Sequence, residues 1–445
     1  MINPILLPEL RLMIAEKDAQ GLFEVTTELH PATVADFTEG LSVDETWEVL
    51  SHAPLGTQAE IFSYYSNTKQ EEMVLGAGRQ RMSSLLEEMA PDNRVDLLKR
   101  LDENVVQELL PLIAKAERHD IVTLLSYPEH SAGSVMTTEY ASLPADITAS
   151  EALSRLRSVA PDNEMIYYIY VIGPERHLTG FISLRDLILA RPGALVSDLM
   201  ERDVISARVD EDQEEIAKKI ARYDFLSLPI VDATGKLVGI VTHDDVIDVV
   251  REEAVEDVQM MGGVAPLTVG YLQTRILTLT WKRGMWLGIL FLTALFTTTA
   301  LKRYEDAQEQ FQWLVIFLPL IMSCGGNSGS QSATLIISAL STGDISLRDW
   351  YIVVRRELLM GLLLGAGLGG LGLLIALFYV GWPRAMVVLA TVLLVVTCGT
   401  IVGSILPLAF RRAGLDPALM SNPFVSGIID ILGIVIYMNV AIAML

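Results

Sequence analysis

The sequence predicts a multidomain membrane protein with an all-α superhelical N-terminal domain, a duplicated α/β pair and an α-helical transmembrane bundle of five spans. Three observations predict this class. Apolar residues recur at helical spacing up to about residue 127, and a strand, turn, strand and helix pattern occurs twice between about residues 133 and 257. Long apolar segments dominate the remainder, and about 20 apolar residues suffice to cross a ~30 Å hydrocarbon core.

Residues 1–130 are expected to form a cytoplasmic helical domain. The segments RVDLLKRL (94–101) and VVQELLPLIAKA (105–116) space their apolar residues three and four apart, and phrases built from a proline, an acidic cap and an apolar turn recur. Such recurrence predicts a small superhelix in which neighbouring units complete one another's core. An irregular helical domain is the alternative.

Residues 131–199 and 200–243 are interpreted as two copies of one α/β unit. Met136 corresponds to Met200 and Gly180 to Gly239, and in each copy a second strand leads into an Asp-containing helix start, at residues 184–186 and 243–245. A strand, a glycine turn, a second strand and a helix, occurring twice, indicate paired α/β units, the second of which runs into the next helix.

Residues 244–280 are expected to form an acidic connecting helix. Seven acids and one arginine occupy DDVIDVVREEAVEDVQMM (244–261), and a second acidic run, DEDQEE (210–215), lies in the preceding repeat. An ordinary solvated helix face is the simpler interpretation of a charge run. Two acidic surfaces held together, however, repel each other unless cations lie between them, and oxygen-only clusters suit hard ions such as Mg²⁺.

Residues 281–445 are predicted to form the transmembrane domain. The five spans are expected at about 284–301, 313–341, 358–380, 385–410 and 424–445. Basic residues gather before the first span, between the second and third, and between the fourth and fifth, which predicts a cytoplasmic N-terminus and an extracytoplasmic C-terminus. The many glycines of the third span indicate close helix packing.

Two features of these spans point to a cation pathway. The second span contains Gly325, Gly326, Asn327, Ser328 and Gly329, where we expect the helix to unwind, and unwound backbone at membrane depth requires protein or water to satisfy it. The last span carries Asp430 and no basic residue, so a passing cation is its expected partner. A paired structural carboxylate or a protonated packing residue are the alternatives. A homodimer would place two copies of Asp430 near one axis.

The repeats resemble a tandem CBS domain, through YYIYVIGPERHLTGFISLRDL (167–187) and LPIVDATGKLVGIVTHDDV (228–246). The whole chain resembles the MgtE family of magnesium channels and transporters, through the domain order and the motifs PLIMSCGGNSGSQSATL (319–335) and LDPALMSNPFVSGIIDILG (415–433). This resemblance implies a homodimeric Mg²⁺ pathway in the plasma (inner) membrane, gated by intracellular Mg²⁺.

The resemblance also implies site residues. The pore ion sites it implies are Asp430, Asn422 and the carbonyls of Gly326 and Ser426, to which we add Asp416 from the second motif. The implied regulatory Mg²⁺ ligands are Asp212, Glu214, Asp224, Asp245, Asp248, Glu253 and Glu256, with Asp92 and Asp96 from the helical domain. ATP is a further ligand that the resemblance implies for the CBS pair, with Tyr168, Arg185, Asp186 and Phe225 as candidates.

One position departs from the family pattern. The family often has GGNTGNQ where this chain has GGNSGSQ, so Ser330 replaces an asparagine. A serine hydroxyl can still bond a water of hydrated Mg²⁺, but a direct amide ligand is lost there.

Several function classes are disfavoured. From Gly284 onward basic and acidic residues balance, so the net charge of -22 lies in the preceding residues, a surface that repels nucleic acid. All six histidines precede Gly284, no HExxH motif occurs and no phosphate-binding GxxxxGK[ST] motif is found, so we expect no enzyme. A divalent-cation transporter of broader selectivity, carrying Co²⁺ or Mn²⁺, and a nucleotide-sensing membrane scaffold remain as alternatives.

Overall fold

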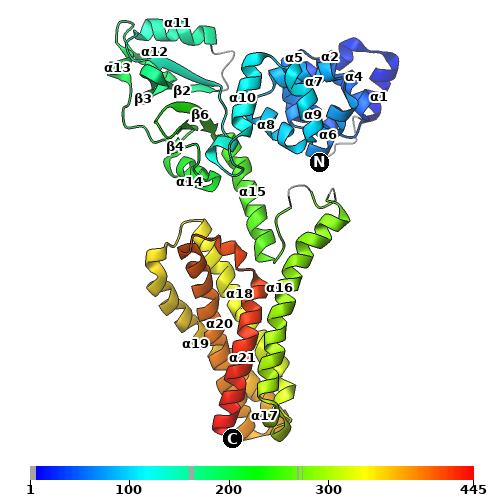
Figure 1. Ribbon diagram of the computed structural model, residues 1–445, viewed down its shortest axis with the longest axis vertical. Coiled ribbons are helices and arrows are strands. Elements are labelled where there is room, and N and C mark those ends of the chain that lie inside the picture. Colours follow the sequence, from blue (N-terminus) through cyan, green and yellow to red (C-terminus); the bar gives the residue numbers. More distant parts are fainter. Residues whose placement is uncertain (1–6, 160–164, 268–269, 273) are drawn as a thin grey trace. The chain divides into compact units, whose positions relative to one another are not determined.

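The computed structural model describes residues 7–159, 165–267, 270–272 and 274–445. The chain divides into two units, Met1–Glu252 and Glu253–Leu445, which are described separately (Figure 1).

Ten α-helices precede the α/β repeats in the described part of the first unit. They are α1 (Leu7–Glu16), α2 (Ala19–Glu28), α3 (Pro31–Thr38), α4 (Val43–Leu50), α5 (Leu55–Ser63), α6 (Asn67–Gly76), α7 (Arg79–Glu88), α8 (Pro91–Arg100), α9 (Glu103–Leu109) and α10 (Lys115–Leu125). Polar caps start several of them, and at α4 Ser42 and Glu45 form a reciprocal capping box that satisfies two backbone N–H groups.

These helices stack in two rows. From α3 onward each odd-numbered helix packs against the next odd-numbered one, and α4, α6, α8 and α10 pack in the same way. The rows share a core that includes Trp47, Phe62, Met82 and Leu97. Each helix pair therefore completes its neighbour's core, which is the superhelical arrangement expected from the recurring phrases and not the irregular alternative.

The α/β repeats have identical strand connections. The first contains β1 (Tyr140–Pro144), α11 (Ala149–Val159), β2 (Met165–Ile172), β3 (Leu178–Ser183) and α12 (Leu184–Leu189); the second contains α13 (Val196–Leu199), β4 (Ala207–Arg208), α14 (Gln213–Tyr223), β5 (Ser227–Val231) and β6 (Leu237–Thr242). In each sheet the first strand is parallel to the second, and the second is antiparallel to the third. The predicted duplication is confirmed.

The two repeats are joined reciprocally. A Cβ atom added at Gly239 would lie 2.7 Å from the Met136 sulfur, and one at Gly180 would lie 2.8 Å from the Met200 sulfur. Met136 of the first repeat therefore packs on Gly239 of the second, and Met200 of the second packs on Gly180 of the first. This symmetry explains why Met136 corresponds to Met200 and Gly180 to Gly239 in the sequence.

The connecting region is helical over only part of its predicted length. Helix α15 covers His243–Met261, an irregular segment follows, and residues 276–280 already belong to the first membrane helix. Within the second unit, the Leu267 N–H donates to the side chain of Gln259 at 2.7 Å, and Lys282 donates to the Pro266 carbonyl. Residues 266 and 267 are thereby tied to α15 and α16.

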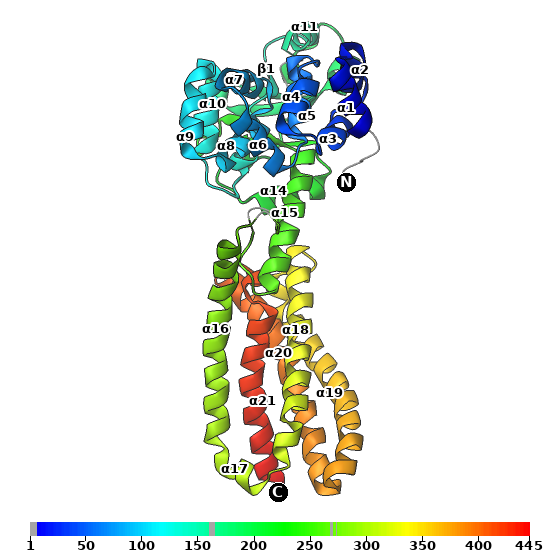
Figure 2. The ribbon, with the colours of Figure 1, turned by 90° about the vertical axis from the view of Figure 1, so that its right-hand side faces the viewer.

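The second unit is a bundle of long apolar helices. They are α16 (Ile276–Arg303), α18 (Leu314–Ser341), α19 (Trp350–Val380), α20 (Trp382–Arg412) and α21 (Asn422–Met444), with the short α17 (Glu305–Gln310) after α16. By length and composition four described helices can cross a membrane, and α18 falls outside that group because serine, glycine and asparagine dilute its apolar residues. In Figures 1 and 2, α16 and α19 lie at opposite edges of the bundle, with α18, α20 and α21 between them.

The expected unwinding of α18 is wrong. The helix runs without interruption through residues 325–329. A Cβ atom at Gly329 would lie 3.0 Å from the Gly399 carbonyl oxygen, and one at Gly403 would lie 2.2 Å from the Gly329 carbonyl oxygen. The glycines therefore allow α18 and α20 to pack backbone against backbone, as small residues do in membrane bundles.

Candidate functional site

A polar stripe follows one face of α21. Asn422, Ser426 and Asp430 are spaced by four residues, so each lies about 40° around the helix from the one before it. The rest of the helix is apolar and contributes Val425, Ile429 and Tyr437 to the core. The stripe therefore places one carboxylate, one hydroxyl and one amide along a single line in a membrane helix.

Helix α18 presents its own four-residue series to this stripe. A Cβ atom at Gly326 would lie 2.4 Å from the Ser426 hydroxyl oxygen, so any larger residue would displace that side chain. Ser330 donates to the Asn422 carbonyl at 3.2 Å, and Thr334 donates to the Asn422 side-chain oxygen at 3.2 Å. Residues 326, 330 and 334 thus fix the start of α21. Thr334 was not identified from the sequence, although its spacing from Ser330 would have indicated it.

The remaining predicted pore groups lie in different settings. Within the described residues, the half-buried Asp430 side chain has no hydrogen bond or salt bridge. Gly326 lies in the middle of α18 and Ser426 in the first turns of α21, so both carbonyls belong to continuous helices. Asp416 is exposed and accepts a hydrogen bond from the Ala418 N–H at 2.8 Å, which makes it a cap of the short turn before α21.

A second polar series on α18 is exposed on the single chain. Ser323, Asn327 and Gln331 are four residues apart, and Asn327 donates to the Ser323 hydroxyl at 3.3 Å. A row of amides and hydroxyls on a membrane helix is unfavourable against lipid tails. This series, which the sequence reasoning missed apart from Asn327, indicates that the face borders water, ions or another chain.

The end of α15 packs on α18 and on the segment before α21 within the second unit. Met260 shares a buried cluster with Ile337 of α18 and Ala418, which follows Asp416. Gly263, with a φ of 71°, lies near Ser421, the residue that precedes Asn422. The C-terminal end of α15 and the residues just after it therefore contact α18 and the start of α21.

A cluster of carboxylates lies where α8 and the start of α15 meet in the first unit. Burial raises the pKa of Asp245 to about 8, the negative charge of Asp92 adds to the shift, and a hydrogen bond from Thr242 opposes it. Burial also raises the pKa of Glu252, with repulsion from Asp96 and Asp248 as further causes. These acids repel one another, and Glu252 was not among the predicted site residues.

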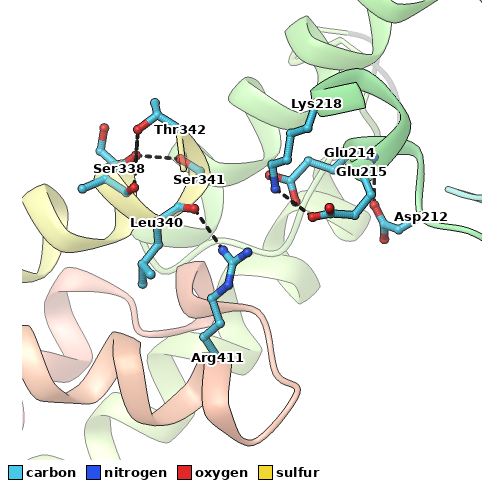
Figure 3. A network of polar contacts seen from close by, with 10 residues as sticks. Asp212, Glu214, Glu215, Lys218, Ser338, Leu340, Ser341, Thr342 and Arg411 are labelled. Atoms are coloured by element: carbon cyan, nitrogen blue, oxygen red, sulfur yellow. Dashed lines mark hydrogen bonds and ion pairs between the residues drawn. The ribbon is translucent and has the colours of Figure 1, made fainter. Parts of the chain in front are cut away.

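The other predicted regulatory acids lie apart from this cluster, and an ion pair is described for one of them, Glu214. Asp212 caps α14 by accepting from the Glu214 N–H, and Lys218 pairs with Glu214 at 2.9 Å and Glu215 at 3.0 Å (Figure 3). Asp224 ends α14 in a left-handed conformation. Glu253 and Glu256 lie on the part of α15 that belongs to the second unit. In the described residues no three His, Cys, Asp or Glu side chains converge to hold a metal ion.

A cavity of about 190 Å³ opens between the two repeats. Its walls include Tyr168 from β2 and Phe225 just before β5, two of the four nucleotide candidates, together with Glu201 and Asp203. Arg185 and Asp186 are not among the lining residues: both are exposed, and Asp186 accepts a hydrogen bond from Ser183 at the start of α12.

Comparison with known proteins assigns all three parts of the chain. Residues 29–130 match the MgtE intracellular N domain, residues 132–193 and 196–252 match CBS domains, and residues 318–440 match MgtE, described as a divalent cation transporter. The chain is 39% identical to the magnesium transporter MgtE of Thermus thermophilus over 96% of both sequences. The chain belongs to the MgtE family.

MgtE relatives from other organisms extend this similarity. The magnesium transporter MgtE of Bacillus subtilis is 31% identical and covers 98% of this chain, with 96% of its own length aligned. The resemblance inferred from the two membrane motifs is therefore confirmed, and so is the combination of helical domain, CBS pair and membrane bundle. Membership places the protein in a family of transporters and not of enzymes.

Two solved structures resemble about half of this MgtE chain. One, the soluble part of a magnesium transporter, is 34% identical with a TM-score of 0.54 and covers 56% of this chain and 98% of its own. The other, the cytosolic domain of the Mg²⁺ channel MgtE in complex with ATP, is 39% identical with a TM-score of 0.52 and covers 54% of this chain and 98% of its own.

Proposed function

We propose that this protein carries Mg²⁺ across the plasma membrane along a path bordered by α18 and α21. The observation that carries the proposal is the stripe of Asn422, Ser426 and Asp430, whose only carboxylate has no partner among the described residues. The relatives that align over nearly the full chain are named magnesium transporters.

The chemistry of the stripe suits an ion that keeps its waters. Mg²⁺ dehydrates reluctantly and usually binds proteins through one or two carboxylates plus several waters. Asp430 would supply the charge, while Asn422 and Ser426 would hydrogen-bond the ion's water shell. Because both the Gly326 and Ser426 carbonyls belong to continuous helices, water-mediated contact with them is favoured over direct coordination.

A homodimer completes this path. The exposed series Ser323, Asn327 and Gln331 on α18 requires polar surroundings at membrane depth. A second copy placed against this face would enclose a polar corridor and bring two Asp430 carboxylates to one divalent ion. Each ion path would then contain two Asp430 carboxylates, one from each chain.

We assign the N-terminal unit to the cytoplasm and Leu445 to the opposite side. Arg348 lies between α18 and α19, Arg355 and Arg356 lie in the first turns of α19, and Arg411 and Arg412 end α20, which supports this orientation by the positive-inside rule. Arg411 also donates to the Leu340 carbonyl at the end of α18 at 3.0 Å (Figure 3), so it helps to close that helix.

Intracellular Mg²⁺ is the proposed regulator. Repulsion between Asp92 and Asp245 favours separation of the helical domain from α15 when Mg²⁺ is scarce. Bound Mg²⁺ would relieve that repulsion and favour a closed arrangement, and a ligand shifts such an equilibrium only by its differential affinity for the two states. Because α15 is continuous to Met261, which lies beside the residues before Asn422, it can transmit the change to the path.

ATP is proposed as a second cytosolic ligand. The relative solved with ATP supports this assignment, and the aromatic walls of the cavity between the repeats suit a nucleobase. Glu201 and Asp203 suit the ribose hydroxyls, whereas they repel phosphates, so the triphosphate should point out of the cavity.

Uptake in magnesium-starved cells tests the transport function. Cells that produce the protein should take up Mg²⁺ and grow, and Asp430→Ala should remove both effects. Asp306→Ala, which removes an exposed acid outside the stripe, should leave both intact. Equal uptake by Asp430→Ala would contradict the proposal, and equal rates for Co²⁺ or Mn²⁺ would favour the broader cation transporter.

A further inference from the structure

A second carboxylate lies within the membrane bundle. Glu357 is in α19, inside the candidate span Leu347–Val380. Among the described residues it forms no salt bridge, even though Arg355 and Arg356 precede it. Its side chain instead accepts a hydrogen bond from the buried Ser332 hydroxyl of α18 at 2.5 Å. A hydroxyl donating to a carboxylate at this distance is a strong, charge-assisted bond.

The backbone around Glu357 is locked to α20. Thr400 donates to the Glu357 carbonyl at 3.0 Å. One turn later, a Cβ atom at Gly361 would lie 2.4 Å from the Thr400 hydroxyl and 2.8 Å from the Thr397 Cα. Glu357 therefore projects from a helix that packs closely on α20, and its side chain reaches α18.

The face of α18 opposite Ser332 is turned toward the proposed ion stripe of α21. At 100° per residue, Ser330 and Thr334 both lie about 160° around the helix from Ser332. These two hydroxyls donate to Asn422 at 3.2 Å each. Glu357 and Asn422 thus form hydrogen bonds with opposite sides of the same turns of α18.

We infer that Glu357 is a positioning residue for ion selection: through Ser332 it sets the rotation of α18 and so the placement of Asn422 beside the path. The inference rests on the proposed transport of Mg²⁺. It assigns a role in transport to a carboxylate that makes no contact with the stripe itself and acts through the helix between them.

Purified full-length protein in liposomes tests this inference. Glu357→Ala and Ser332→Ala should each change the half-saturating Mg²⁺ concentration or the ratio of Mg²⁺ to Co²⁺ uptake by about three- to tenfold, the range expected for one lost hydrogen bond. The double variant should match either single variant, because both remove one interaction. Glu357→Gln, whose amide oxygen still accepts from Ser332, should stay within about twofold of wild type.

The controls separate the possible failures. Glu309→Ala removes an exposed acid on α17 and should change none of these values. A change with Glu357→Ala but not with Ser332→Ala, or additive effects in the double variant, would overturn the positioning role. Loss of protein yield with unchanged half-saturation and selectivity would overturn it too. Absence of Mg²⁺ uptake by wild type would instead overturn the proposed function itself.

Discussion

At the scale of the residue, Asp245 is the most unfavourable charge outside the membrane bundle. It is largely buried, faces the charge of Asp92 and is held by Thr242. Replacing it with asparagine removes the repulsion and keeps an acceptor for Thr242. Without Mg²⁺, Asp245→Asn should therefore raise the free energy of unfolding of the first unit by about 1 to 3 kcal/mol at pH 8. Thermal unfolding with and without Mg²⁺ measures this, and a lowered midpoint would contradict it.

The same carboxylate predicts a dependence on pH. The pKa of Asp245 is raised in the folded unit, to about 8, from an ordinary value near 4. The folded state therefore binds the proton more tightly, and without Mg²⁺ the free energy of unfolding should fall as pH rises from about 4 to 8. Mg²⁺ should consequently stabilise the unit more at pH 8 than at pH 6. Equal stabilisation at both values would argue against Asp245 as a ligand.

At the scale of the element, the glycines of α18 and α20 decide how closely the two helices pack. A Cβ atom at Gly403 would meet the Gly329 carbonyl oxygen at 2.2 Å, and backbone cannot move aside as a side chain can. Gly403→Ala should destabilise the bundle by about 1 to 3 kcal/mol or more through overpacking. In α19, a Cβ at Gly367 meets no atom within 4 Å, so Gly367→Ala should be neutral or stabilising. Unfolding of the Gly403→Ala and Gly367→Ala variants in detergent measures both stabilities. Equal changes in the free energy of unfolding would refute the packing account.

These helices also show what sequence reasoning can and cannot reach. The existence of the helices and the duplication of the α/β unit follow from patterns along the sequence, whereas Asn422 and Ser426 joined Asp430 as pore candidates through the family resemblance. Whether Gly325, Gly326 and Gly329 unwind the helix could not be predicted from such patterns. The same residues permit either an unwound segment or a close crossing with a partner helix. The Ser332–Glu357 bond joins residues far apart in the chain, so no pattern within one segment could indicate it.

The charged runs show a similar limit. Composition singled out residues 210–215 as acidic, but their partners Arg208, Lys218 and Lys219 lie beside them and neutralise much of that charge. Asp92 is an ordinary acid in the sequence, and the packing of α8 near the start of α15 gives it its importance. Charge counts predicted a cation-sensitive surface, whereas the fold decides which acids form it.

At the scale of the whole molecule, the cavity between the repeats is the proposed place where ATP links the two CBS units. Tyr168 and Phe225 come from different repeats, so ATP bound between them should raise the unfolding temperature of the cytosolic unit. Tyr168→Ala should weaken ATP binding by about tenfold, because it removes the contribution of one stacked aromatic ring to the binding free energy. Arg185→Ala, at an exposed position outside the cavity, is the matched control. Calorimetric titration measures the ATP affinity of both variants. Weaker binding by Arg185→Ala than by Tyr168→Ala would contradict this assignment.

The central claim is that Mg²⁺ passes Asp430 between α18 and α21, and the most direct measurement is Mg²⁺ influx into liposomes that contain only the purified protein. With a membrane potential negative inside, wild type should admit Mg²⁺ when internal Mg²⁺ is low, and added internal Mg²⁺ should slow the influx. Asp430→Asn should abolish the influx while the protein remains folded. Influx through Asp430→Asn at the wild-type rate would contradict the claim.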